Sequence, residues 1–171
     1  MKVSREDIKL IEEQIGRKPR SVLKVLRRCK KGYPQVILTS PVLEDGTPFP
    51  TIFWLTCPFL VKEVSNLEGK GWIKYLQMRF NEDDSLKLEL KKAHDNYRRE
   101  RAFLIGFREA ECDGIGIGGV SNSSWLKCLH AHYAHYLATG CNPVGELVDK
   151  HIGEIGECNE CEKWTGKISI N

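Results

Sequence analysis

Cysteine and histidine gather in one short stretch of this chain, Cys128 to His135, which reads C-L-H-A-H-Y-A-H. The surrounding segment, Ser123 to Thr139, has the apolar spacing of a helix. At about 100° per residue, Cys128, His132 and His135 fall within roughly 60° of one helix face. Thiolate and imidazole ligands suit Zn²⁺ or another borderline to soft transition metal. The stretch predicts a metal site completed from elsewhere in the chain. The alternative is a helix with half-buried or solvated histidines.

Cysteines elsewhere are candidates for the missing ligands. Cys57 ends a predicted strand, where its position is fixed, and is the preferred outside ligand. Cys29 lies in the hairpin sequence Cys-Lys-Lys-Gly-Tyr-Pro, with Lys31 at the place where a zinc knuckle has its second cysteine. Cys158 and Cys161 form a C-x-x-C pair, a spacing typical of half a zinc site or of a redox pair. Incidental thiols in a tail are the alternative for this pair.

A glycine-rich segment, 113–120, precedes the histidine-rich stretch. Backbone N–H groups in such a loop, next to a helix N-terminus, can hold phosphate or carboxylate. The segment lacks the lysine of a Walker A loop and the preceding strand of a dinucleotide fingerprint, so an ordinary loop is an equal alternative. The candidate anion contacts are Gly116, Gly118, Gly119 and Ser121.

Positive charge is concentrated in one part of the chain. The net charge is only +3, but residues 17–31, from Arg17 to Lys31, hold eight lysines and arginines and no acidic residue. Such a segment favours contact with phosphates on nucleic acid or on a small substrate, with a solvated strand face as the alternative.

Length and cysteine content predict the domain organisation of the chain and its cellular location. The 171 residues suit a single domain, with residues 150–171 as a candidate flexible tail. Seven cysteines without a secretion signal indicate reduced thiols and a cytoplasmic protein. No apolar run approaches the roughly 18 residues of a membrane span. The sequence leaves the oligomeric state open.

The order of the patterns predicts an α+β fold, in which a three-stranded antiparallel sheet is followed by, and packs on, several helices. One of these is a long amphipathic helix from Asp83 to about Arg108, which we expect to cover a sheet face through Leu86, Leu90, Tyr97 and Leu104. The other predicted elements are a helix from Ser4 to Gly16, strands at Ser21 to Cys29, Gln35 to Thr39 and Thr51 to Thr56, and helices from Pro58 to about Leu67 and from Trp72 to Phe80.

Many of these residues resemble the pattern of a known family, the bacterial domain-of-unknown-function family number 501. The resemblance spans most of residues 14–145. Its segments are Gly16-Arg-Lys-Pro-Arg20, Arg28-Cys29, Asp45-Gly-Thr-Pro-Phe-Pro-Thr51, Leu55-Thr-Cys-Pro58, Leu67-Glu68 before Gly71, His94-Asp-Asn-Tyr97 with Arg101, Gly118-Gly119, Lys127-Cys-Leu-His130, His135 and Asn142-Pro143.

The resemblance implies a ranking of the candidate ligands. It favours Cys57, Cys128 and His135, and it adds Cys29 as a third thiolate. His94 and His130 also match motif positions, whereas His132, Cys158 and Cys161 look peculiar to this chain. The biochemistry of that family is not established, so the resemblance implies no reaction.

Two hypotheses of different classes follow, with a third beside them. In the first, Cys57, Cys128 and His135 or His132 hold Zn²⁺ with an open position, and the chain is a zinc hydrolase acting on a small anionic substrate, with His130 or His94 moving a proton. In the second, Cys29 closes a structural site, and the chain is a binding module that uses its basic face. Three thiolates with an open position also suit an iron-sulfur cluster. The metal hypotheses place the Cys57 and Cys128 sulfurs within about 4 Å of each other.

Overall fold

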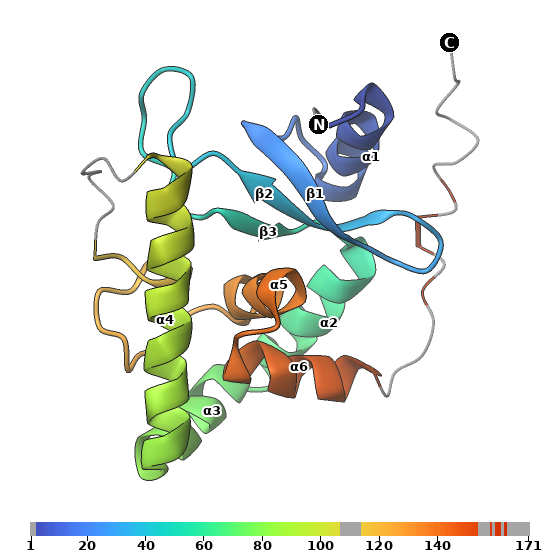
Figure 1. Ribbon diagram of the computed structural model, residues 1–171. Coiled ribbons are helices and arrows are strands. Elements are labelled where there is room, and N and C mark those ends of the chain that lie inside the picture. The colour runs from blue at the N-terminus through green and yellow to red at the C-terminus, as the bar shows by residue number, and fades with distance from the viewer. Residues whose placement is uncertain (1–2, 107–113, 154–157, 159, 162, 164–171) are drawn as a thin grey trace.

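The computed structural model describes residues 3–106, 114–153, 158, 160, 161 and 163. Within them an antiparallel sheet of order β1-β2-β3 is followed by, and packed against, helices, so the α+β prediction is confirmed (Figure 1). The elements are α1 (Arg5–Ile15), β1 (Val22–Arg28), β2 (Pro34–Thr39), β3 (Phe53–Leu55), α2 (Pro58–Gly69), α3 (Trp72–Glu82), α4 (Asp84–Leu104), the 3₁₀ turn η1 (Ile117–Gly119), α5 (Leu129–Thr139) and α6 (Pro143–Gly153). None of the described helices is long and apolar enough to cross a membrane.

Local signals place the first elements where the sequence predicts them. The Ser4 hydroxyl accepts a hydrogen bond from the Asp7 backbone N–H at 3.0 Å and caps α1. Gly16, with φ of 69°, ends that helix in the left-handed conformation. Pro58 begins α2, where its missing N–H costs nothing.

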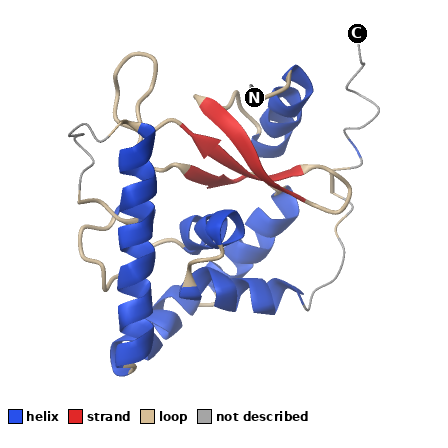
Figure 2. Ribbon diagram, viewed as in Figure 1, coloured by secondary structure: helices blue, strands red, loops and turns tan. Residues whose placement is uncertain are grey.

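Helices lie on both faces of the sheet (Figure 2). Ile37 and Trp54, paired across β2 and β3, line a small pocket with Ile15 of α1. Phe53, whose side chain points to the opposite face, stacks on His135 of α5 with ring centroids 5.5 Å apart. Successive side chains of β3 point to opposite faces of the sheet, so α1 and α5 cover different faces.

The long helix α4 reaches the sheet through two of its predicted contact residues, but it is not the main cover of the sheet. Helix α5 is the main cover of this face, against β3 and with α6 on its other side. Because α5 is apolar around most of its surface, it can be buried between two layers, whereas α4 carries charges on its outer face. Helix α4 reaches the sheet region through Tyr97, whose hydroxyl accepts a hydrogen bond from Ile52 N–H at 2.9 Å, and through Leu104, which lines a pocket with Phe53.

Helix α5 also begins later than predicted, at Leu129 in place of Ser123. Asn122 explains this difference, because its side chain accepts a hydrogen bond from Ser124 N–H at 2.9 Å and its carbonyl accepts one from Trp125 N–H at 3.1 Å. Such local bonds stabilise turns in competition with a helix. Cys128 is extended and precedes α5, so it does not share a helix face with His132 and His135.

The predicted tail is described only in part. Helix α6, which the sequence patterns did not predict, continues to Gly153. Of the following residues, 158, 160, 161 and 163 lie within the described structure.

Gly145 permits the close packing of α5 on α6. A Cβ atom added there would lie 2.3 Å from Tyr136 Cβ and 2.6 Å from the His132 carbonyl oxygen. Gly145→Ala should therefore force the helices apart and lower the free energy of unfolding by about 1–3 kcal/mol. Gly153→Ala, on the same helix with nothing within 4 Å, should change it by less than about 0.5 kcal/mol. Urea denaturation of both variants measures the difference, and equal stabilities would contradict this packing.

Candidate functional site

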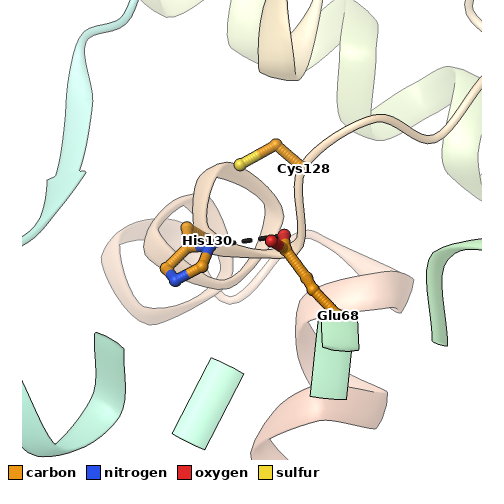
Figure 3. Close-up of side chains that lie close together, drawn as sticks. All are labelled: Glu68, Cys128 and His130. Carbon is orange, nitrogen blue, oxygen red and sulfur yellow. Dashed lines mark hydrogen bonds and ion pairs between the residues drawn. The ribbon is translucent and has the colours of Figure 1, made fainter. Parts of the chain in front are cut away.

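Glu68, Cys128 and His130 form the closest group of metal-ligating side chains in the described residues (Figure 3). Each offers one ligand atom, and these atoms all lie within 4.8 Å of one another. The side chains of His130 and Glu68 are 25% and 27% exposed. The group is therefore accessible from solvent yet partly shielded from it.

Two helix ends bring the group together. Glu68 lies in the last turn of α2, and Cys128 and His130 lie at the N-terminus of α5. Glu68 Oε1 accepts a hydrogen bond from Leu129 N–H at 2.7 Å. The first N–H groups of a helix have no partner within the helix, so this bond both satisfies one of them and fixes α5 to α2.

His130 is oriented by the backbone of α2. Its Nε2 lies 3.1 Å from the Val61 carbonyl oxygen and 3.2 Å from the Ser65 hydroxyl, and that hydroxyl donates to the same carbonyl. A carbonyl only accepts, so Nε2 carries the hydrogen, and Nδ1 is left to face Glu68 Oε1 at 3.3 Å. Burial by itself lowers the pKa of His130, but hydrogen bonding to Cys128, the charge of Glu68 and the Val61 carbonyl together raise it above its ordinary value.

The glycine-rich segment lies next to this group and does not run directly into α5. A Cβ atom at Gly118 would be 3.4 Å from Cys128 Cβ, and Gly118 has a left-handed φ of 71°. On its other side, Ile117 N–H donates to His94 Nδ1 at 3.0 Å. A Cβ atom at Gly116 would be 2.3 Å from that same nitrogen. His94 thus holds the segment from its buried side. Ser121, one of the predicted anion contacts, is exposed.

Three other histidine positions form a separate, fully buried layer: His94, His132 and His135. The His94 and His132 rings meet edge to face at 5.6 Å. Asn142 Oδ1 accepts from Gly145 N–H at 2.9 Å, so the Asn142 amide nitrogen faces Nδ1 of His132 and of His135, each at 3.1 Å. The Nε2 atoms of His94 and His132 have no hydrogen-bond partner among the described residues.

Burial keeps these three imidazoles neutral at pH 7. It lowers the pKa of His94 to about 4, of His132 to about 3 and of His135 to about 4. The mutual proximity of the rings adds to the effect for His132 and His135.

The remaining predicted ligands, Cys29 and Cys57, lie elsewhere. Both line a small pocket together with Cys158 and Cys161. The structure thus distributes the candidate metal ligands over three places. Cys128 lies beside His130. His132 and His135 lie in the buried layer, and Cys57 lies with Cys29. Within the described part of the chain, Cys57 belongs to no set of three ligand atoms as close as the Glu68 group.

Sequence reasoning missed Glu68. Its carboxylate meets Cys128 across 60 positions of sequence, so no local spacing could reveal the pair. The one available signal was Leu67-Glu68 among the segments that resemble the family.

The basic segment from Arg17 to Lys31 spreads over the loop before β1, the strand itself and the following hairpin. Arg28 holds the Asp7 carboxylate with two hydrogen bonds of 2.8 Å, and Arg17 lies over the Trp54 ring at 5.9 Å. Contact of this segment with phosphate stays a prediction.

Comparison with known proteins identifies the family. The model of the family described as "Protein of unknown function (DUF501)" matches residues 25–150, more than half of the chain. The chain belongs to the DUF501 family. No curated protein and no solved structure matches the chain. Family membership confirms the resemblance found in the sequence, and the activity of this DUF501 chain has to be argued from its side chains.

The buried histidines predict loss of stability in acid. Because their folded pKa values lie below the ordinary 6.5, the unfolded chain binds more protons between about pH 6.5 and 4, and the free energy of unfolding falls as the pH falls through this range. Each histidine contributes a slope of about 1.4 kcal/mol per pH unit. His130, with a raised pKa, acts oppositely, and its contribution is lost as the pH rises through its folded pKa.

Urea unfolding at several pH values measures this slope, and histidine ring resonances in NMR spectra assign it. In protein freed of metal by a chelator, His94, His132 and His135 should stay neutral down to about pH 5, whereas His130 should titrate above its ordinary value. Ordinary midpoints for the three buried rings would show that they are not desolvated in solution.

Proposed function

We propose that this chain is a metal-dependent hydrolase in which Glu68, Cys128 and His130 hold a Zn²⁺ ion. The observation that carries the proposal is the convergence of one carboxylate, one thiol and one imidazole within 4.8 Å at a partly exposed site. Three protein ligands with one position left for water is the composition of catalytic zinc sites, whereas structural sites have four protein ligands. The metal would lower the pKa of its bound water towards about 7.

The orientation of His130 favours a metal over a cysteine nucleophile. In a cysteine hydrolase, one imidazole nitrogen serves the thiol and the other faces the acidic residue. Here Nε2 is committed to the Val61 carbonyl, which leaves Nδ1 for both Glu68 and Cys128. A ring N–H bonded to a backbone carbonyl is the usual support of a metal-bound histidine. As a ligand, His130 would not also transfer a proton.

The surroundings favour an anionic substrate, such as a phosphate ester. The glycine-rich segment packs against Cys128 through Gly118, and the same Gly118 position lies close to Lys127 Cβ. Helix α5 begins at Leu129, directly after Cys128, and the helix dipole favours negative charge at this N-terminus. His94, bonded beneath Ile117, would position this segment from the protein interior.

Metal analysis of variants tests the ligand set. Protein purified without added metal should lose about one zinc per chain in Cys128→Ser and in His130→Ala, because two ligands hold Zn²⁺ far more weakly than three. Cys141→Ser, which changes an exposed cysteine, should keep the metal of the wild type. Unchanged zinc in Cys128→Ser would refute the site.

Hydrolysis of p-nitrophenyl phosphate and its bis ester tests the reaction. The rate should fall at least about tenfold in Glu68→Gln and should return in the wild type when zinc is restored after chelation. Hydrolysis that survives complete chelation but is lost in Cys128→Ser would identify the thiol as the nucleophile and contradict the metal mechanism.

A further inference from the structure

Four cysteines from three distant parts of the chain line one small pocket. Cys29 is in the hairpin between β1 and β2, Cys57 immediately precedes α2, and Cys158 and Cys161 form the C-terminal C-x-x-C pair. Cys57 and Cys161 are buried, and Cys29 and Cys158 are partly exposed. None of these four belongs to the Glu68 group, so this pocket is a separate feature of the molecule.

Hydrogen-bond donors already approach two of the sulfurs. Glu160 is the second of the two residues between Cys158 and Cys161, and its N–H donates to Cys158 Sγ at 3.3 Å. Gln14 Nε2 lies 3.5 Å from Cys161 Sγ and is held by a 2.8 Å bond to the Pro34 carbonyl. N–H groups directed at sulfur support thiolate ligands around a metal, because they disperse negative charge.

A positive charge beside the cysteines also favours a metal site made of thiolates. Lys31 also lines the pocket. Four thiolates around Zn²⁺ leave two negative charges in excess, and a lysine beside them offsets part of that excess.

We propose that Cys29, Cys57, Cys158 and Cys161 form a structural zinc site that fastens the C-terminal segment to the hairpin and to the end of β3. Four thiolates, two of them from a C-x-x-C pair, make a closed tetrahedral set with no position for water. Within the described residues, no three of these sulfurs are mutually within 4.8 Å. Metal binding therefore draws the C-terminal pair inward onto Cys29 and Cys57.

Alkylation of the full-length wild type tests this site directly. Protein purified in reductant is treated with N-ethylmaleimide, with and without a zinc chelator, and each cysteine is followed by peptide mass spectrometry. Cys29 and Cys158 are the informative positions, because burial protects Cys57 and Cys161 in any case. Both should become at least about tenfold more reactive after chelation, whereas exposed Cys141 should react equally in both samples.

Variants separate this site from the Glu68 group. Cys158→Ser changes a partly exposed residue outside the core, so it should fold and lose about one zinc while keeping the zinc that depends on Cys128. Cys128→Ser should do the reverse. Chelation should lower the Tm of Cys128→Ser more than that of Cys158→Ser, because only the former keeps the metal that ties the C-terminal segment down.

Several results would overturn the proposal. They are full zinc content in Cys158→Ser, equal alkylation of Cys29 and Cys158 with and without chelator, a Cys158 to Cys161 disulfide in place of metal, or the visible absorption of an iron-sulfur cluster that is lost in the same variant. Loss of zinc only in Cys128→Ser would support the proposed hydrolase and refute this second site.

Discussion

Burial of helix α5 between the sheet and α6 decides where most candidate functional residues lie. Its first residues meet the end of α2, where Glu68 accepts the Leu129 N–H, and so Cys128 and His130 are held beside a carboxylate. Its middle turns enter the core, where Phe53 stacks on His135. Gly145 makes this placement sterically feasible, because any side chain there would collide with the backbone of α5.

The same helix gives neighbouring histidines opposite properties. His130, in the first turn and partly exposed, has a raised pKa because Cys128, Glu68 and the Val61 carbonyl outweigh its desolvation. His132, two positions later, is fully buried and has a lowered pKa. Its layer with His94 and His135 depends on Asn142, whose amide donates to two rings while its oxygen accepts from α6. Such a layer specifies one arrangement of α4, α5 and α6, since a shifted helix would leave several polar atoms without partners.

Helix α2 connects the two groups for which we propose metals. Cys57 immediately precedes it and Glu68 lies eleven residues further on, which is about 16 Å along the helix axis. One end therefore faces the hairpin and the C-terminal cysteines, and the other faces α5. A rigid helix between them would let the proposed cysteine site stabilise the fold while the proposed site at Glu68 stays open to solvent.

Much of the local structure was determined by the sequence itself, because Ser4, Gly16 and Pro58 act on neighbouring backbone groups. The strands, the α+β order and the family resemblance were predictable for the same reason, since each depends on patterns within a short segment. Only the tertiary structure decided the rest. Helix α5 begins only at Leu129, so Cys128 lies off its predicted helix face, and Glu68 and the C-terminal cysteines met their partners across 60 or more positions. Such meetings depend on how buried elements pack, and local spacing carries no record of that packing.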